Sequence, residues 1–156
     1  MPNYDFGKDL IVAKETEKEV AVLLEKIYNA KILQFGETNK WDILAEINGK
    51  KVSFEVKEDF VGERTGNVGL EYSCRGKSSG IETSEADFYI YKLHTKYHGI
   101  QYVQHKTSEL KNKIKNVEYF TTVNGGDPDS NSLNYLFKYN SFIKDCVFLT
   151  LPLDRN

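Results

Sequence analysis

One short motif restricts the fold of this chain more than any other. Asn48-Gly49 joins two segments, WDILAEI (41–47) and KVSFEVK (51–57), in which apolar and polar residues alternate. Alternation with a period of two is typical of strands, and Asn-Gly favours the two-residue type I′ turn, in which both central residues have a positive φ. The motif therefore predicts an antiparallel β-hairpin over 41–57.

The turn type sets which residues face each other. In a type I′ turn at Asn48-Gly49, Asp42 falls directly opposite Glu55. A looser turn centred on Gly49-Lys50 would instead set Asp42 opposite Lys57. Both registers leave Asp42, Glu55 and Lys57 on one face of the hairpin, because side chains alternate between faces. The other face is expected to point into the core and carries Ile43, Ala45, Ile47, Val52, Phe54 and Val56.

The negative charges of two directly opposed carboxylates, Asp42 and Glu55, repel each other. Directly opposed Cβ atoms on neighbouring strands lie about 4.5–5.5 Å apart, and like charges at that spacing are destabilising. A divalent cation between Asp42 and Glu55 would remove the repulsion, and Mg²⁺ prefers one or two carboxylates together with waters and phosphate oxygens. Lys57 would add a positive charge beside the ion. The alternative is an exposed hairpin face whose surface ion pairs contribute little to stability.

The rest of the chain predicts a single α/β domain over 1–156 with a mixed central sheet flanked by helices. Helical spacing predicts a first helix at 13–29, and Thr107 is expected to cap a second one through 115. Further strands are expected at 31–35, 68–74, 87–93, 100–106 and 117–123, a polar connector at 75–86 and a loop at 124–132. The core covers about 13–120, and the extension 121–156 has no assigned place.

Charge is unevenly distributed. The net charge is -2, yet residues 92–115 contain six lysines and a single acid, Glu109. Such a window fits either a surface that binds phosphate backbones or a solvated helix face with strand ends. Cys74 and Cys146 lack the spacing of a disulfide framework or a zinc site. Without an apolar stretch of about 18 residues or a basic-then-apolar leader, we expect a cytoplasmic protein that does not enter a membrane.

The order of these features resembles the PD-(D/E)XK nuclease superfamily over roughly 13–105. A helix is followed by a hairpin that carries Asp42 on one strand and Glu55-Val56-Lys57 on the next. Trp41 stands where the family has the proline of its name. The segment GNVGLEYSCRGKSSGIETSEADFYIY (66–91) is similar to small phage-encoded and Holliday-junction-resolvase-like members.

The resemblance implies a set of site residues. Asp42, Glu55 and the main-chain carbonyl of Val56 would bind Mg²⁺, with Mn²⁺ as a substitute, and Lys57 would assist the attacking water. Many members add a glutamate from the first helix, for which Glu17 is preferred over Glu19 because it lies nearer the apolar stripe. Glu71 is a further candidate ligand or base. In the polar connector, donors to DNA phosphates are expected from Arg75, Lys77, Ser79 and Thr83.

Together these residues predict a Mg²⁺-dependent DNA endonuclease, with branched or recombination DNA as one substrate. Two alternatives remain open: a non-catalytic nucleic-acid-binding module that keeps the nuclease fold, and a site-specific restriction-type endonuclease. Cleavage of both strands requires two active sites, so a homodimer is expected. We expect no small-molecule cofactor.

Overall fold

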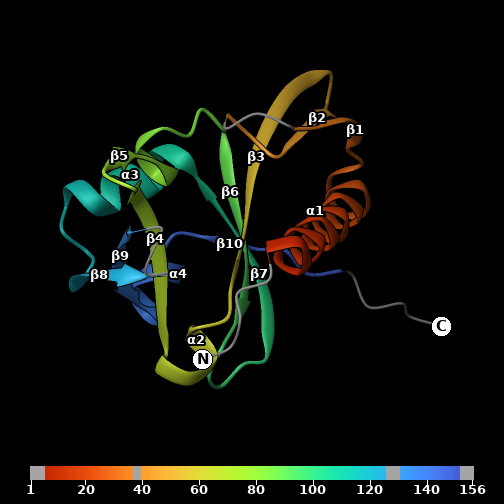
Figure 1. The fold of residues 1–156 in the computed structure, drawn as a ribbon. Helices are drawn as coiled ribbons and strands as arrows, with labels where there is room; N and C mark the ends of the chain where they lie inside the picture. The colour runs from red at the N-terminus through yellow and green to blue at the C-terminus, as the bar shows by residue number, and fades with distance from the viewer. Residues whose placement is uncertain (1–5, 37–39, 126–130, 152–156) are drawn as a thin grey trace.

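The protein is built in three layers, which Figure 1 shows edge-on as helix α1, a central sheet and a second sheet. This computed structural model describes residues 6–36, 40–125 and 131–151. The central layer confirms an α/β domain with a mixed sheet. Its six strands run in the order β1 (Lys31–Phe35), β2 (Ile43–Ile47), β3 (Lys50–Asp59), β6 (Phe88–His94), β7 (Ile100–Lys106) and β10 (Val147–Phe148). Only the β3–β6 pair is parallel among these strands.

The hairpin of β2 and β3 has the predicted type I′ register. Ile47 pairs with Lys50 and Ile43 with Phe54. Asn48 and Gly49 both have positive φ, 53° and 79°. The looser register centred on Gly49-Lys50 is therefore not the one adopted, and Asp42 lies at the end of the ladder next to Glu55.

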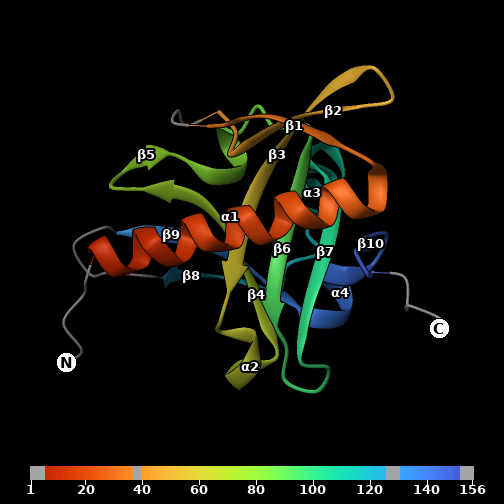
Figure 2. The same ribbon diagram turned by 90° about the vertical axis from the view of Figure 1, so that its right-hand side faces the viewer.

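Helix α1 (Phe6–Tyr28) covers one face of the central sheet and crosses it obliquely in Figure 2. It was predicted from residue 13 and begins earlier, at Phe6. Val20 and Leu24, both fully buried, contact the fully or almost fully buried Ile43, Phe54 and Ile90. The predicted core face of the hairpin is thus the face beneath α1.

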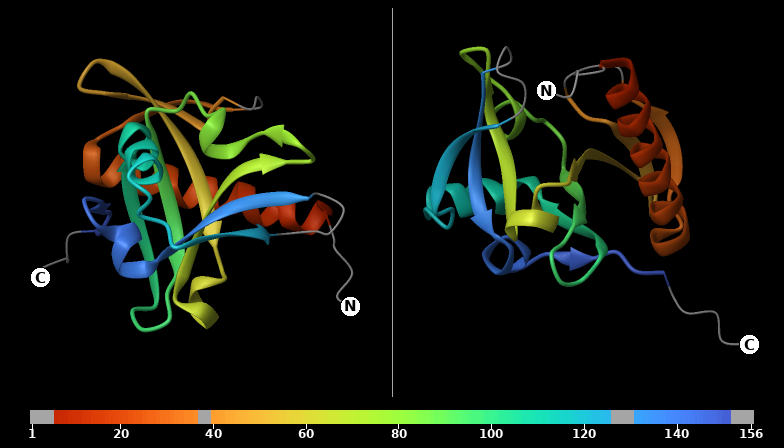
Figure 3. Two further views of the ribbon diagram at one scale, coloured as in Figure 1. Left: turned by 90° about the vertical axis from the view of Figure 1, so that its left-hand side faces the viewer. Right: turned by 60° about the horizontal axis from the view of Figure 1, so that its bottom comes forward.

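The opposite face is covered by a second sheet, which the sequence did not predict. Its strands run in the order β5 (Lys77–Ser78), β4 (Asn67–Cys74), β9 (Ser132–Lys138) and β8 (Thr121–Gly125), all antiparallel. Figure 3 shows this layer in front of the central sheet, close to α3 (Thr107–Lys115) and α4 (Tyr139–Ile143). Leu70 and Phe137 pack there against Tyr89 and Leu93. The second core involves β6 and β7, whereas the described residues of the hairpin contribute only to the core beneath α1, as predicted.

Several local predictions need correction. Thr107 does not cap α3. Lys106 is the N-cap and makes no side-chain capping bond, and the buried Thr107 hydroxyl has no hydrogen-bond partner among the described residues. The strand expected at 117–123 begins at Thr121, because Val117 adopts a positive φ of 54°.

The loop expected at 124–132 has ends that belong to β8 and β9, and 126–130 lie outside the described residues. The connector 75–86 contains β5 and the 3₁₀ turn η1 (Gly80–Glu82), and α2 (Gly62–Thr65) follows β3. Within the described ranges, no helix is long and apolar enough to span a bilayer.

Candidate functional site

A cavity of about 470 Å³ opens between α1 and the β2–β3 hairpin. It brings together the three hairpin residues singled out from the sequence, Asp42, Glu55 and Lys57, and it adds Glu17 from the helix. The remaining lining residues are Val12, Ala13, Thr16, Val56, Glu58 and Phe60. Three carboxylates and one ammonium of the predicted set therefore face a shared space.

Asp42 is held in place by main-chain hydrogen bonds. Its N–H donates to the carbonyl oxygen of Phe54 at 2.9 Å, and its Oδ2 accepts from the N–H of Val56 at 2.8 Å. Burial raises the pKa of the Asp42 carboxyl, although the Val56 N–H and the Lys57 charge act in the opposite direction. The side chain is thus fixed in orientation but lacks full compensation for its charge.

Glu55 is the most strongly perturbed acid of the site. Its Oε1 lies 3.5 Å from Nζ of Lys57, and its side chain is 15% exposed. Burial raises the pKa of Glu55 to about 7, with further contributions from the charges of Asp42 and Glu17, while Lys57 lowers it. One lysine does not offset the cost of ionising a buried carboxylate beside two others.

The structure separates the two helix glutamates that the sequence left as alternatives. Glu17 lines the cavity, and burial together with the charge of Asp42 raises its pKa to about 6. Glu19 lies elsewhere on α1, where its Oε2 accepts from Lys92 Nζ at 2.7 Å and from the Tyr102 hydroxyl at 2.6 Å. Glu17 is therefore the helix residue that joins Asp42 and Glu55.

Glu71 lies on β4 in the second sheet and does not line the cavity with Asp42 and Glu55. Its two oxygens accept from the hydroxyls of Ser79, at 3.1 Å, and Ser132, at 2.8 Å. It does line an adjoining cavity of about 550 Å³, together with Lys57. Its position fits a structural link between the connector and the second sheet.

The four expected DNA contacts differ in their surroundings. Arg75 and Lys77 are exposed at the turn between β4 and β5, where Arg75 has a positive φ of 54°. Thr83 is exposed as well, and its hydroxyl makes a long bond of 3.4 Å to the carbonyl of Gly80. The Ser79 hydroxyl donates to Glu71. Arg75 and Lys77 consequently present the least restricted donors.

The basic window 92–115 does not form one continuous surface. Lys92 pairs with Glu19, and Lys113 is 3% exposed with its Nζ donating to the carbonyl of Ser141 at 3.0 Å. His105 in the same window is fully buried. Part of the positive charge is thus neutralised or buried within the fold, because Lys92 on β6 pairs with an acid of α1 and Lys113 on α3 points inward.

One group at the rim of the cavity escaped the sequence analysis. Glu58 accepts from the Thr16 hydroxyl at 2.7 Å through Oε1, and its Oε2 lies 2.7 Å from Nε2 of His94. The ring of Phe60 stacks on that of His94 with centroids 4.4 Å apart. The strand alternation places Glu58 on the α1 face of β3 and Glu55 on the other face. Only the position of α1 could therefore have revealed that Glu58 lies close to the candidate site.

The donor set of the cavity suits a hard cation. Asp42, Glu55 and the main chain of Val56 offer oxygen ligands, the kind that Mg²⁺ uses together with water and phosphate oxygens. In the described part of the chain, no group of three or more His, Cys, Asp or Glu residues is placed to hold a metal ion. Because Mg²⁺ sites commonly rely on one or two carboxylates, the available donors still fit this ion.

No protein-family model matches the chain, and no curated protein sequence matches it. Among solved structures, the chain is similar to a bacterial homing endonuclease, I-Ssp6803I, with 13% sequence identity and a TM-score of 0.45. The similar region covers 62% of this chain and 68% of that one.

Proposed function

We propose that this protein is a Mg²⁺-dependent DNA endonuclease that hydrolyses phosphodiester bonds. The observation that carries the proposal is the grouping of Asp42, Glu55 and Glu17 around one cavity beside Lys57, each of the three acids with a raised pKa. Strongly perturbed acids in a cleft are typical of catalytic and metal sites. A divalent cation would relieve the repulsion among all three.

Asp42 and Glu55, with the main-chain carbonyl of Val56, would hold the ion. Bound there, Mg²⁺ would supply positive charge to the phosphate oxygens and lower the pKa of a nearby water. The Val56 N–H bond to Asp42 fixes one carboxylate before any ligand arrives. Preorganisation of this kind reduces the reorganisation needed during the reaction.

Lys57 and Glu17 have complementary roles in the proposed hydrolysis. The Lys57 ammonium, adjacent to Glu55, can orient the attacking water and stabilise charge that develops on the phosphoryl oxygens. Glu17, with its pKa near 6, can accept the proton that the water loses as its oxygen bonds to phosphorus and the P–O ester bond breaks. Arg75 and Lys77 would contact backbone phosphates away from the reacting bond.

A substrate panel tests the activity directly. Linear duplex, single strand, flap, four-way junction and RNA are incubated with Mg²⁺, with Mn²⁺ and with EDTA. We expect cleavage of DNA that requires the metal. Binding of these nucleic acids without turnover in either metal would contradict the proposal and favour a non-catalytic binding module. The distribution of cuts would separate a branched-DNA enzyme from a site-specific restriction-type enzyme.

The pH dependence of metal binding follows from the raised pKa values. Glu55, with its pKa near 7, must lose its proton before it can act as a charged ligand, and Glu17, with its pKa near 6, adds negative charge to the cavity once it is ionised. Mn²⁺ affinity measured by titration calorimetry should therefore rise by up to about tenfold per pH unit between pH 5 and 7 and level off above that range. In Glu55→Gln the rise should shrink to the contribution of the remaining acids. A flat affinity from pH 5 to 8 would argue against the carboxylates as ligands.

The homodimer proposed for two-strand cleavage has its own test. Sedimentation velocity at the protein concentration used for cleavage should give a dimer in the presence of duplex or junction DNA. A monomer that still makes paired cuts in one binding event would contradict this part of the proposal.

A further inference from the structure

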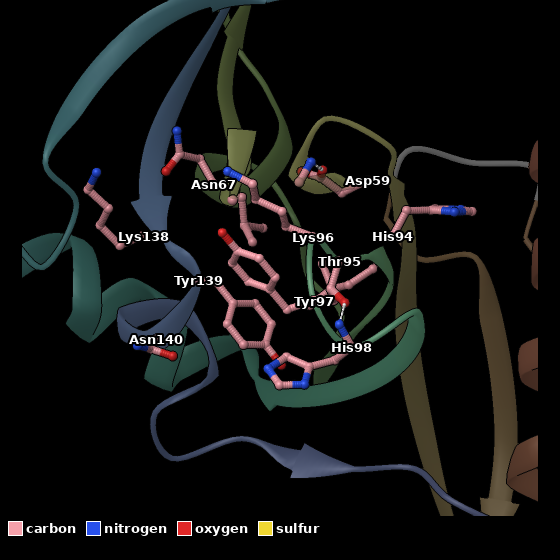
Figure 4. Close-up of a pocket in the computed structure, with 14 residues that line it drawn as sticks. Asp59, Asn67, His94, Thr95, Lys96, Tyr97, His98, Lys138, Tyr139 and Asn140 are labelled. Atoms are coloured by element: carbon pink, nitrogen blue, oxygen red, sulfur yellow. Dashed lines mark hydrogen bonds between the residues drawn. The ribbon is translucent and has the colours of Figure 1, made fainter. Parts of the chain in front are cut away.

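A second cavity, of about 330 Å³, lies beside α2 and the turn between β6 and β7 (Figure 4). Its volume falls within the range of roughly 300–1,000 Å³ found for small-molecule sites. The lining comes from three separate segments, at the end of β3 with α2, at the β6–β7 turn, and at the start of α4. None of the residues discussed as cleavage residues lines it.

Aromatic rings dominate this cavity. Tyr97, at the β6–β7 turn, is 80% exposed, so most of its ring is accessible to a ligand. Tyr139 stacks on His98 with centroids 5.7 Å apart and planes 28° from parallel, and its hydroxyl donates to Gln101. In Figure 4 both tyrosines lie in the cavity, whereas His94 points away from it. The cavity thus offers flat, partly fixed surfaces for another flat group.

Two lysines also line this cavity. Lys96 and Lys138 line the cavity, and neither ammonium forms an ion pair with an acid of the described residues. Instead they lie over aromatic rings, Lys138 at 4.6 Å from the centroid of Phe120 and Lys96 at 5.4 Å from that of Tyr97. Asp59, the acid in the lining, is already occupied by hydrogen bonds from the N–H groups of Gly62 and Gly69. The lining therefore carries two lysines against one carboxylate, and the oxygens of that carboxylate are turned to main-chain N–H groups.

The cavity adjoins the candidate active site through shared residues. Asp59 and Asn67 line both this cavity and the one of about 550 Å³ next to it. Lys57 and Phe60 in turn line both that middle cavity and the one that contains Asp42 and Glu55. Shared lining residues thus link the three cavities in order, from the carboxylates to Tyr97.

We propose that this cavity binds an unpaired nucleotide of the DNA substrate, with the base against Tyr97 and Tyr139 and the phosphate near Lys96 and Lys138. Aromatic platforms combined with basic side chains are the usual means of binding single-stranded nucleic acid. A base within a duplex has both faces stacked on its neighbours and cannot reach such rings. The placement of this nucleotide on a strand that is cut at Asp42 and Glu55 rests on the proposed nuclease function.

Binding measured without cleavage separates this inference from the catalytic proposal. Fluorescence anisotropy in EDTA compares the full chain with Tyr97→Ala, Tyr97→Phe and Phe148→Ala on three probes: a labelled single strand, the same sequence as a blunt duplex, and a labelled dAMP. Tyr97→Ala should weaken single-strand binding by about tenfold, as expected for loss of one base stack. Duplex binding should change by less than about twofold, since the ring does not contact paired bases. Tyr97→Phe retains the ring and should behave as the original chain.

Phe148→Ala is the matched control, because Phe148 is an exposed aromatic, 42% accessible, on β10 in the central sheet. It should leave all three affinities unchanged. Equal weakening of single strand and duplex by Tyr97→Ala would overturn the inference, as would an unchanged single-strand affinity. Tight binding of dAMP with no binding of the single strand would overturn the strand placement. Intact, Tyr97-dependent binding with no cleavage in Mg²⁺ would instead reject the nuclease function and leave the nucleotide site standing.

Discussion

Glu55→Gln is expected to reduce Mg²⁺-dependent DNA cleavage by at least about 10³-fold, because it removes a negative ligand and leaves a neutral amide of nearly the same shape. The same substitution should stabilise the metal-free protein. The pKa of Glu55 is raised to about 7 in the folded state, above its ordinary value of 4.5, so the stability it contributes is lost as the pH rises through 7. At pH 8 in EDTA, the free energy of unfolding of Glu55→Gln should therefore be about 1–3 kcal/mol higher.

Urea denaturation at pH 8 and at pH 4.5 measures the expected gain in stability. The difference in the free energy of unfolding between Glu55→Gln and the original chain should vanish at pH 4.5, where Glu55 carries its proton. Glu46→Gln is the matched control on the same hairpin, since Glu46 lies on β2 outside the cavity. It should alter neither cleavage nor stability by a comparable amount. Loss of cleavage together with lower stability at pH 8 would mean that Glu55 supports the fold and not a metal.

Gly80→Ala should lower the free energy of unfolding by about 2–5 kcal/mol. Gly80 has a positive φ of 53°, and an added Cβ would lie 2.8 Å from the carbonyl carbon of Glu71 and overlap its oxygen. The neighbouring main chain belongs to β4 and cannot move without disturbing the second sheet. A loss of this size is a large part of the total stability of a domain, typically about 5–15 kcal/mol.

Gly76→Ala separates the two causes of destabilisation, which are the positive φ and the steric overlap with Glu71. Gly76 has a similar φ of 75°, but nothing lies within 4 Å of its added Cβ. It should therefore cost only the conformational penalty of about 1–2 kcal/mol. Equal losses for the two variants in urea denaturation would show that the overlap with Glu71 relaxes and that backbone conformation alone is responsible.

The hairpin and its polar face were predictable because the interactions that specify them are local. Asn48-Gly49 sets the turn type, the turn sets the register, and period-two alternation then places Asp42, Glu55 and Lys57 on one face. The first helix and most strands followed from periodicity in the same way. These elements depend on neighbours within a few residues along the chain.

The positions of Glu71, Ser79 and Glu58 depended on packing between distant segments. Glu71 was predicted as a ligand or base from its place in a strand, and the structure puts it in the second sheet, bonded to Ser79 and Ser132. Alternation shows that a strand exists but not which strand pairs with it. The second sheet joins β4 to β9, and no local pattern in 121–156 indicated that pairing.

The amino-acid sequence by itself determined the hairpin and the set of acids and lysine on its polar face, which both possible registers share. Only the tertiary structure decided that Glu17 and not Glu19 joins them, that both faces of the central sheet are buried, and that Tyr97, Lys96 and Tyr139 border a common cavity. The physical reason is that a turn and a strand face are specified by backbone sterics over a few residues. A cavity is specified by the packing of elements from many parts of the chain, which no local pattern encodes.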